Sequence, residues 1–224
     1  NKIGDRGVVK IAQGLYSNQK LLDLDLEANN YTHTGAIVLA GSLKANSILE
    51  RLSLSWNGDG DLVSAAVSEA LSLNKTLRIL KMRVNRSYHE DENFPTNRAS
   101  YIAEGLKKNR TLVHLTFSGS DIRDQGAVDL AKAIRENNSL RSLDLTWNKI
   151  KTEGARELAK SLKLNQGLAR VDLRENPITE QQAKKIFGSD LGERVNLSSY
   201  HFGVLDSHPF THKRRRDYHF FPNQ

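Results

Sequence analysis

One unit of about 28 residues recurs along most of the chain, and this repetition constrains the fold more than any other feature. The clearest copy is the stretch 140–148, a short strand pattern in which Leu140, Leu143 and Leu145 are the first, fourth and sixth residues. A helical pattern of apolar residues follows a few positions later. A unit this short cannot bury its own apolar face, so we expect successive units to stack around one continuous core.

The strand pattern occurs six times, and its spacing is regular. It starts at Leu21, Leu49, Leu77, Leu112, Leu140 and Leu168. Successive starts lie 28 residues apart, except that 35 residues separate Leu77 from Leu112. The ninth residue of each unit is an asparagine, with Ser120 as the one replacement. An amide at this place can bond backbone groups where the strand turns away, so we expect an asparagine ladder with Ser120 as its weak rung.

A helical pattern follows each strand pattern and ends at an asparagine. These asparagines are Asn18, Asn46, Asn74, Asn109, Asn137 and Asn165. Asparagine tolerates the left-handed backbone conformation that often closes a helix, so we expect that conformation at these six positions. The last helix is predicted to run from near Thr179 to Gly188, and residues 194–197 are predicted to form a short edge strand.

The unit LxxLxLxxN, followed by G-A-x-x-L-A, resembles the ribonuclease-inhibitor class of leucine-rich repeats, most closely at residues 1–7 and 148–155. The resemblance covers roughly residues 1–187. It implies an α/β fold, a curved leucine-rich repeat solenoid with a parallel β-sheet on the concave face and α-helices on the convex face. The class includes ribonuclease inhibitor, NOD-like receptor sensor regions, Ran GTPase-activating proteins and effectors of intracellular bacteria, so it implies a fold more than a function.

Two segments depart from the repeat. Seven extra residues fall within the acidic stretch 86–95, and we expect a loop there. Residues 198–224 follow no repeat and are rich in aromatic residues and histidine. We expect this segment to fold back as a C-terminal cap, which gives a solenoid over 1–197 and a capping segment over 198–224. Asn1 takes the ninth place of a unit, so we also expect further sequence upstream.

Composition narrows the function classes. The chain has no cysteine, which excludes disulfides, thiolate zinc sites and thiol nucleophiles, and favours a reducing, cytoplasmic location. Nuclear import through the basic run 213–216 is the alternative. We find no apolar run long enough for a membrane span. No phosphate-binding glycine loop, nucleophile elbow or HExxH motif is present, so we expect neither enzymatic activity nor a cofactor. Pro209 separates His208 from His212, which argues against a metal pair.

Strand residues between the inward leucines are expected to point out onto the concave face. The predicted partner-binding residues are Trp56, Trp147, Arg51, Lys81, Arg83, Asp144 and Asp25. Tryptophan and arginine dominate binding hot spots because they bury a large area and keep a polar group. In ribonuclease inhibitor, aromatic residues of the concave rim contact the partner, and the resemblance extends that role to the two tryptophans. The open alternatives are that the tryptophans pack on their neighbours and that the arginines pair with acids of the next strand.

The sequence predicts a protein–protein interaction module, a cytosolic scaffold, sensor or effector that binds an unidentified protein on its concave face. The alternative function is a GTPase-activating protein resembling that of Ran, with Arg51 or Arg83 near the switch loops of the GTPase. A third hypothesis is binding of nucleic acid or an anionic surface through the basic C-terminal segment.

Overall fold

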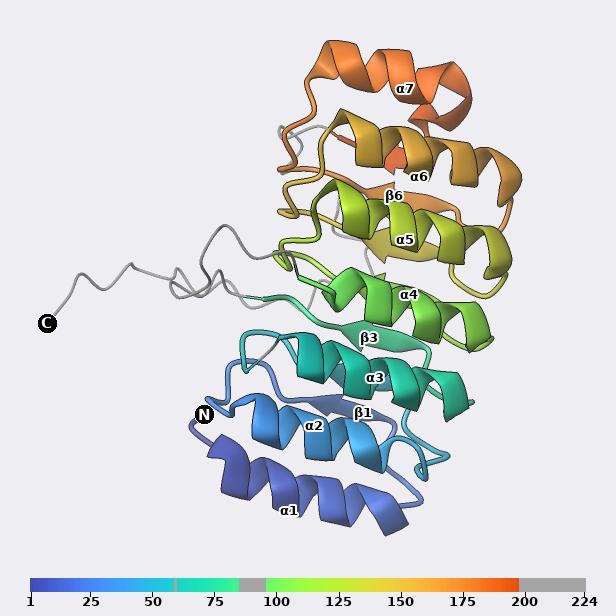
Figure 1. Ribbon diagram of the computed structural model, residues 1–224. Coiled ribbons are helices and arrows are strands. Elements are labelled where there is room, and N and C mark those ends of the chain that lie inside the picture. The colour runs from blue at the N-terminus through green and yellow to red at the C-terminus, as the bar shows by residue number, and fades with distance from the viewer. Residues whose placement is uncertain (59, 85–95, 198–224) are drawn as a thin grey trace, which may run out of the picture.

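The computed structural model describes residues 1–58, 60–84 and 96–197. The insertion at 86–95, the ladder position Asn85 and the predicted cap at 198–224 lie outside the described residues. In the described part, helices and strands alternate, and the helices stand in front of the strands in Figure 1. The elements are α1 (Gly4–Ser17), β1 (Asp23–Asp25), α2 (His33–Ser42), β2 (Arg51–Ser53), α3 (Asp61–Leu73), β3 (Ile79–Lys81), α4 (Arg98–Lys108), β4 (His114–Thr116), α5 (Arg123–Glu136), β5 (Ser142–Asp144), α6 (Thr152–Leu164), β6 (Arg170–Asp172), α7 (Glu180–Gly192) and β7 (Val195–Asn196).

The strands form one open parallel sheet in chain order, from β1 to β7. Each strand pairs with the equivalent residues of the next unit, so that Leu24 faces Leu52 and Leu52 faces Leu80. The hydrogen-bonded part is three residues long in most strands and begins two residues after the leucine that opens the sequence pattern. Parallel strands covered by helices on one side confirm the predicted α/β leucine-rich repeat solenoid.

The core lies between the sheet and the helix layer and runs the length of the solenoid. From the second unit onward, the apolar triplets and the helix residues facing them are buried, as shown by Leu143, Leu145, Leu158 and Leu162, all with no exposed surface. Burying one such side chain contributes about 1.5–3 kcal/mol. Gly154 allows the helices to approach closely, since a Cβ there would lie 2.8 Å from the Cβ of Ala127.

The predicted asparagine ladder is confirmed. Each amide spans two units: Asn148 Nδ2 donates to Phe117 O at 2.7 Å, and Asn148 Oδ1 accepts from Ser120 N at 2.8 Å. Asn57 and Asn176 repeat this arrangement in their own units. The Ser120 hydroxyl reaches only the carbonyl of Ser118, at 3.5 Å, which is the weak rung that its short side chain predicts.

The conformation predicted for the asparagines at the helix ends is wrong. Asn74 has φ −70° and ψ 135°, and Asn109 has φ −72° and ψ 139°, both extended rather than left-handed. Their side chains instead build a second ladder. Asn137 Nδ2 donates to Leu106 O and Asn109 O, at 2.7 and 3.0 Å, and its Oδ1 accepts two backbone N–H groups of the following turn. Extended backbone aims the amide at the free carbonyls of the preceding helix end, which a left-handed turn would not do.

The last helix is interrupted at Gly188, where its end is predicted. Gly188 has φ 58° and ψ −164°, which are not helical, and a second helical segment follows it, so that α7 runs to Gly192 across a kink. The predicted edge strand is confirmed as β7, which pairs with β6. Arg194 then closes the second ladder, because its guanidinium donates to Leu162 O at 2.8 Å and to Asn165 O at 2.6 Å. Of the helices described, none has the length and apolar character that a membrane span requires.

Candidate partner-binding face

The side of the sheet that faces away from the helices is called here the sheet face. Successive strand side chains point to opposite sides, so the residues on either side of each buried central residue lie on this face. The row of third strand residues is Asp25, Ser53, Lys81, Thr116, Asp144 and Asp172, aligned by the strand register. The parallel register thus turns a repeated sequence position into a continuous surface row.

Trp56 and Trp147 occupy the eighth place of their units, three residues beyond the ends of β2 and β5. Both have φ of 60°, in the left-handed region that favours glycine, and Gly119 takes the same place in the fourth unit with φ 69°. The tryptophans are 38% and 51% exposed. A bulky residue in this conformation costs about 1–2 kcal/mol, and partial exposure means that packing recovers only part of that cost.

Arg51 and Arg83 are held by groups of the sheet itself. Arg51 Nε donates to Asp23 Oδ2 at 2.9 Å, which raises the pKa of the guanidinium. Arg83 Nε donates to Ser118 Oγ at 3.0 Å, and its Nη2 lies 3.9 Å from Asp144 Oδ2. Arg51 on β2 is therefore paired with an acid, but that acid comes from the preceding strand β1 and not from the next strand.

Asp144 is the most enclosed acid among the predicted residues, with 20% of its side chain exposed. Burial raises its pKa, and the charge of Asp172 on the next strand adds to this, while the Thr146 N–H and Arg83 act in the opposite direction. Glu27 behaves similarly at the other end of the face, where burial and the charge of Asp25 raise its pKa. The sheet face therefore presents carboxylates whose charged form is not fully stabilised by the protein itself.

The structure brings some predicted residues together and keeps others apart. Arg83 approaches Asp144, and Asp25 and Lys81 share one row with a single strand between them. The tryptophans are three units apart, about 14 Å by strand spacing, so they do not pack on each other.

Sequence reasoning missed the ion pair at the C-terminal end of this face. Arg174 donates to both oxygens of Asp172, at 2.6 to 3.0 Å. Asp172 and Arg174 are two positions apart, the spacing that puts side chains on the same side of an extended chain. That spacing was the feature of the sequence from which the ion pair could have been predicted.

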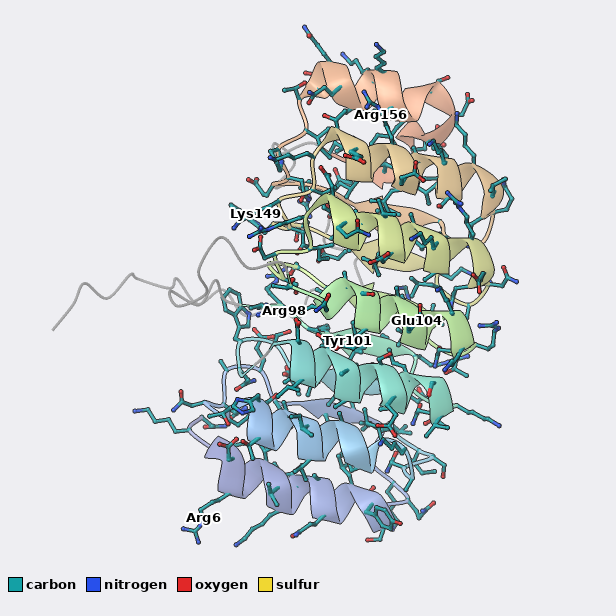
Figure 2. All side chains as sticks on the ribbon, viewed as in Figure 1. Arg6, Arg98, Tyr101, Glu104, Lys149 and Arg156 are labelled. Atoms are coloured by element: carbon teal, nitrogen blue, oxygen red, sulfur yellow. The ribbon has the colours of Figure 1, made fainter. Side chains whose placement is uncertain are left out.

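The edge at which strands lead into helices carries a different cluster. Asp121 Oδ2 lies 2.8 Å from Arg123 Nη2, and Asp121 Oδ1 lies 3.1 Å from Lys149 Nζ. Figure 2 shows Lys149 at this edge. Both cations lower the pKa of Asp121. Within the ranges described, no three histidine, aspartate or glutamate side chains are grouped as a metal site would require. The histidines of the C-terminal segment fall outside those ranges.

Comparisons with known proteins agree with this geometry. A family model described as Leucine Rich repeat matches residues 108–131 and 136–159. Leucine-rich repeat-containing protein 45 of Gallus gallus is 33% identical over 89 residues, which make up 39% of this chain and only 13% of that protein.

Among solved structures, the tropomodulin C-terminal domain of Caenorhabditis elegans superposes with a TM-score of 0.52 and 15% identity, over 72% of this chain and 92% of that one. Leiomodin-1 actin-binding site 2 superposes with a TM-score of 0.43 and 14% identity, over 82% and 87%, a likeness too loose to argue from. The repeated sequence unit, the parallel sheet, the matching family model and these similar proteins all lead to one conclusion: the chain contains leucine-rich repeats and has the fold of a leucine-rich repeat solenoid.

Proposed function

We propose that this chain is a protein-interaction module whose sheet face binds a protein partner, with Trp56 and Trp147 as anchors. The observation that carries the proposal is that both tryptophans are exposed while their backbone is left-handed. Backbone strain that local packing does not repay points to a use outside folding.

The charges of the face support a partner of mixed charge. Asp25 and Glu27 lie at the N-terminal end, Lys81 and Arg83 in the middle, and Asp144 towards the C-terminal end. Pairs such as Arg51–Asp23 are more than 40% exposed on both sides and are therefore weak enough to exchange partners. Charges arranged in this way set specificity and orientation more than they set affinity.

The GTPase-activator alternative gains no support from the geometry. A catalytic arginine for phosphoryl transfer has to reach into the partner's site, and nothing in the geometry of Arg51, beside Asp23, or of Arg83, beside Ser118, marks either residue for that role. The nucleic-acid hypothesis concerns the basic C-terminal segment, which lies outside the described residues. We also propose a cytoplasmic location, with the nucleus as the alternative.

The test is site-specific photo-crosslinking with a benzophenone amino acid at position 147 and, as the matched control, at position 101. Tyr101 is 40% exposed on the helix layer, as Figure 2 shows, so both probes are similarly accessible. We expect a protein that crosslinks from position 147 and not from 101. Equal capture from both positions, or none from 147, contradicts the proposal.

The captured protein is then titrated in purified form. Trp56 and Trp147 are the only tryptophans of the chain, so intrinsic fluorescence reports on the sheet face alone when the partner lacks tryptophan or carries 5-fluorotryptophan. We expect the double substitution Trp56→Asn/Trp147→Asn to weaken binding at least thirtyfold, the loss of about 2 kcal/mol that defines a hot spot. Unchanged affinity would remove the tryptophans from the site.

A further inference from the structure

A second charged surface lies at the edge of the solenoid where helices lead into strands. A cavity of about 480 Å³ opens there, lined by residues of the turns before β3, β4 and β5. Four cations surround it, Lys75, Arg78, Arg110 and Arg141, and none of the lining residues is acidic. We call it the edge pocket; it shares no residue with the sheet-face proposal.

The cations of the edge pocket differ from those of the sheet face in one respect. On the sheet face, Arg51, Arg83 and Arg174 each lie beside a carboxylate of the same protein. In the edge pocket, none of the four cations forms an ion pair within the described part of the chain. Four formal positive charges therefore converge on one cavity with no anion from the protein to balance them there.

Two of the guanidiniums are already held in position. Arg110 Nη1 donates to Lys107 O at 2.6 Å and to Asn109 O at 2.9 Å. Arg141 Nη1 donates to Asn138 O at 2.8 Å, and it lies so close over Gly167 that a Cβ there would be 2.7 Å from it. Each bond uses one nitrogen and leaves the remaining N–H groups for a ligand. Fixed side chains lose little entropy on binding, which favours affinity.

The repeat sets the spacing of the pocket. Arg78, Val113 and Arg141 occupy equivalent places, each one residue before β3, β4 or β5, and are joined by hydrogen bonds from Val113 N to Arg78 O and from Arg141 N to Val113 O, both at 2.8 Å. Two strand spacings place the arginine backbones about 9.6 Å apart, so both side chains can reach one tetrahedral anion above the short Val113. The dipole of a helix attracts a cation to its C-terminus, which by itself accounts for a basic residue in the last turn. Arg78 and Arg141 lie farther from the helix ends, where this attraction has faded, so the dipole does not account for them.

We propose that the edge pocket binds a phosphate monoester, such as a phosphorylated serine of a peptide. Arginine forks match phosphate oxygens in geometry and charge, and a dianion balances more of the local charge than a carboxylate does. A phosphomonoester gains its second charge near pH 6, whereas arginine stays charged throughout, so binding is expected to strengthen as pH rises from about 5 to about 7.5.

The test is calorimetric titration of the whole chain with a short phosphoserine peptide of neutral flanks, its serine and glutamate forms, inorganic phosphate, and a single-stranded oligonucleotide. We expect saturable binding of the phosphopeptide and weaker binding of inorganic phosphate. We expect no binding of the serine form, and the glutamate form at least tenfold weaker. Equal binding of the phosphoserine and glutamate forms, tighter binding of the oligonucleotide, or no saturable binding overturns the proposal.

Substitutions locate the site. Arg78→Gln and Lys75→Gln are expected to weaken phosphopeptide binding about tenfold, and neither side chain bonds another residue in the described ranges, so both variants are expected to fold. Arg156→Gln, on the exposed surface of α6 in Figure 2, is the charge-matched control. A loss as large in Arg156→Gln as in the pocket variants means non-specific attraction and overturns the proposal.

Discussion

At the scale of single residues, the left-handed backbone at the eighth place is the feature that a sequence pattern does not reveal. Ala28, Trp56, Trp147 and Glu175 all adopt it, with φ between 54° and 60°. Gly119 shares it, so five of the six units have this conformation with different side chains, and Val84 of the third unit does not. In the sequence, a tryptophan at this position is only an apolar residue before the ladder asparagine. The fold shows that the backbone at this position is strained.

This strain predicts an inverted order of stability at position 147. Trp147→Asn is expected to change the free energy of unfolding by less than about 1 kcal/mol, since asparagine tolerates positive φ. Trp147→Val is expected to lower it by about 1–2 kcal/mol, although valine is the more apolar residue, because β-branching suits positive φ least. Urea denaturation followed by circular dichroism measures both. A Val variant as stable as the Asn variant contradicts the strain.

Asp144 gives a prediction for pH. Burial raises its pKa above the unfolded value near 3.8, so the folded state binds the proton more readily and loses stability as pH rises through that interval. Asp144→Asn keeps an acceptor for the Thr146 N–H and is expected to raise the free energy of unfolding at pH 7 by roughly 1 kcal/mol or less. The gain should vanish below pH 3.8.

Asp5 serves as a control, because its pKa is shifted in the direction opposite to that of Asp144. Hydrogen bonds from the Thr32 backbone and side chain lower its pKa, so its contribution is present above the unfolded value and is lost as pH falls. Asp5→Asn is expected to be less stable than the wild type at pH 7 and equal to it in acid. The same direction of change in both variants contradicts the assignment.

At the scale of elements, the sequence predicted the strands well and the helix ends less well. Alternating leucines gave the six strand positions, since only one register buries all of them. The helix-end asparagines were placed correctly but given the wrong conformation, because propensity describes an isolated helix and not its neighbour. Asp124 shows the same limit: it opens α5, yet its Oδ1 accepts from Lys151 N and Gly154 N at the start of the next helix.

The second ladder predicts that two asparagines adjacent in sequence, Asn137 and Asn138, contribute very differently to the free energy of unfolding. The Asn137 side chain is buried and makes four hydrogen bonds with the backbone of its own turn and of the equivalent turn one unit earlier. Asn137→Ala leaves those groups without partners and is expected to cost about 2–4 kcal/mol. Asn138→Ala, at an exposed position, is expected to cost less than about 0.5 kcal/mol. Thermal and urea unfolding compare the two, and equal losses would show that the ladder contributes nothing.

At the scale of the whole molecule, the fold could be predicted from the sequence because one unit is repeated. For the same reason, the binding site could not be predicted with equal certainty. Stacking needs only the apolar and asparagine positions, which all units share. The sheet face depends on the remaining positions, where Trp56 recurs in one other unit and Lys81 in none. Charge pairing such as Arg83 with Asp144 depends on side chains from units two strands apart, and the edge pocket emerges only when three turns are brought together.

A solenoid in which each unit contacts only its neighbours should respond locally to damage at its end. Arg194 ties the last turn to the end of the fifth unit through Leu162 O and Asn165 O, and to the start of the sixth through Leu168 O. Arg194→Ala removes these bonds, and hydrogen exchange in β6, β7 and α7 is expected to accelerate at least tenfold, since each bond contributes about 1 kcal/mol. Exchange in α2 and α3 should stay unchanged, as it should throughout the chain in Arg156→Ala. Acceleration of equal size in every unit would mean that the solenoid unfolds as one cooperative block.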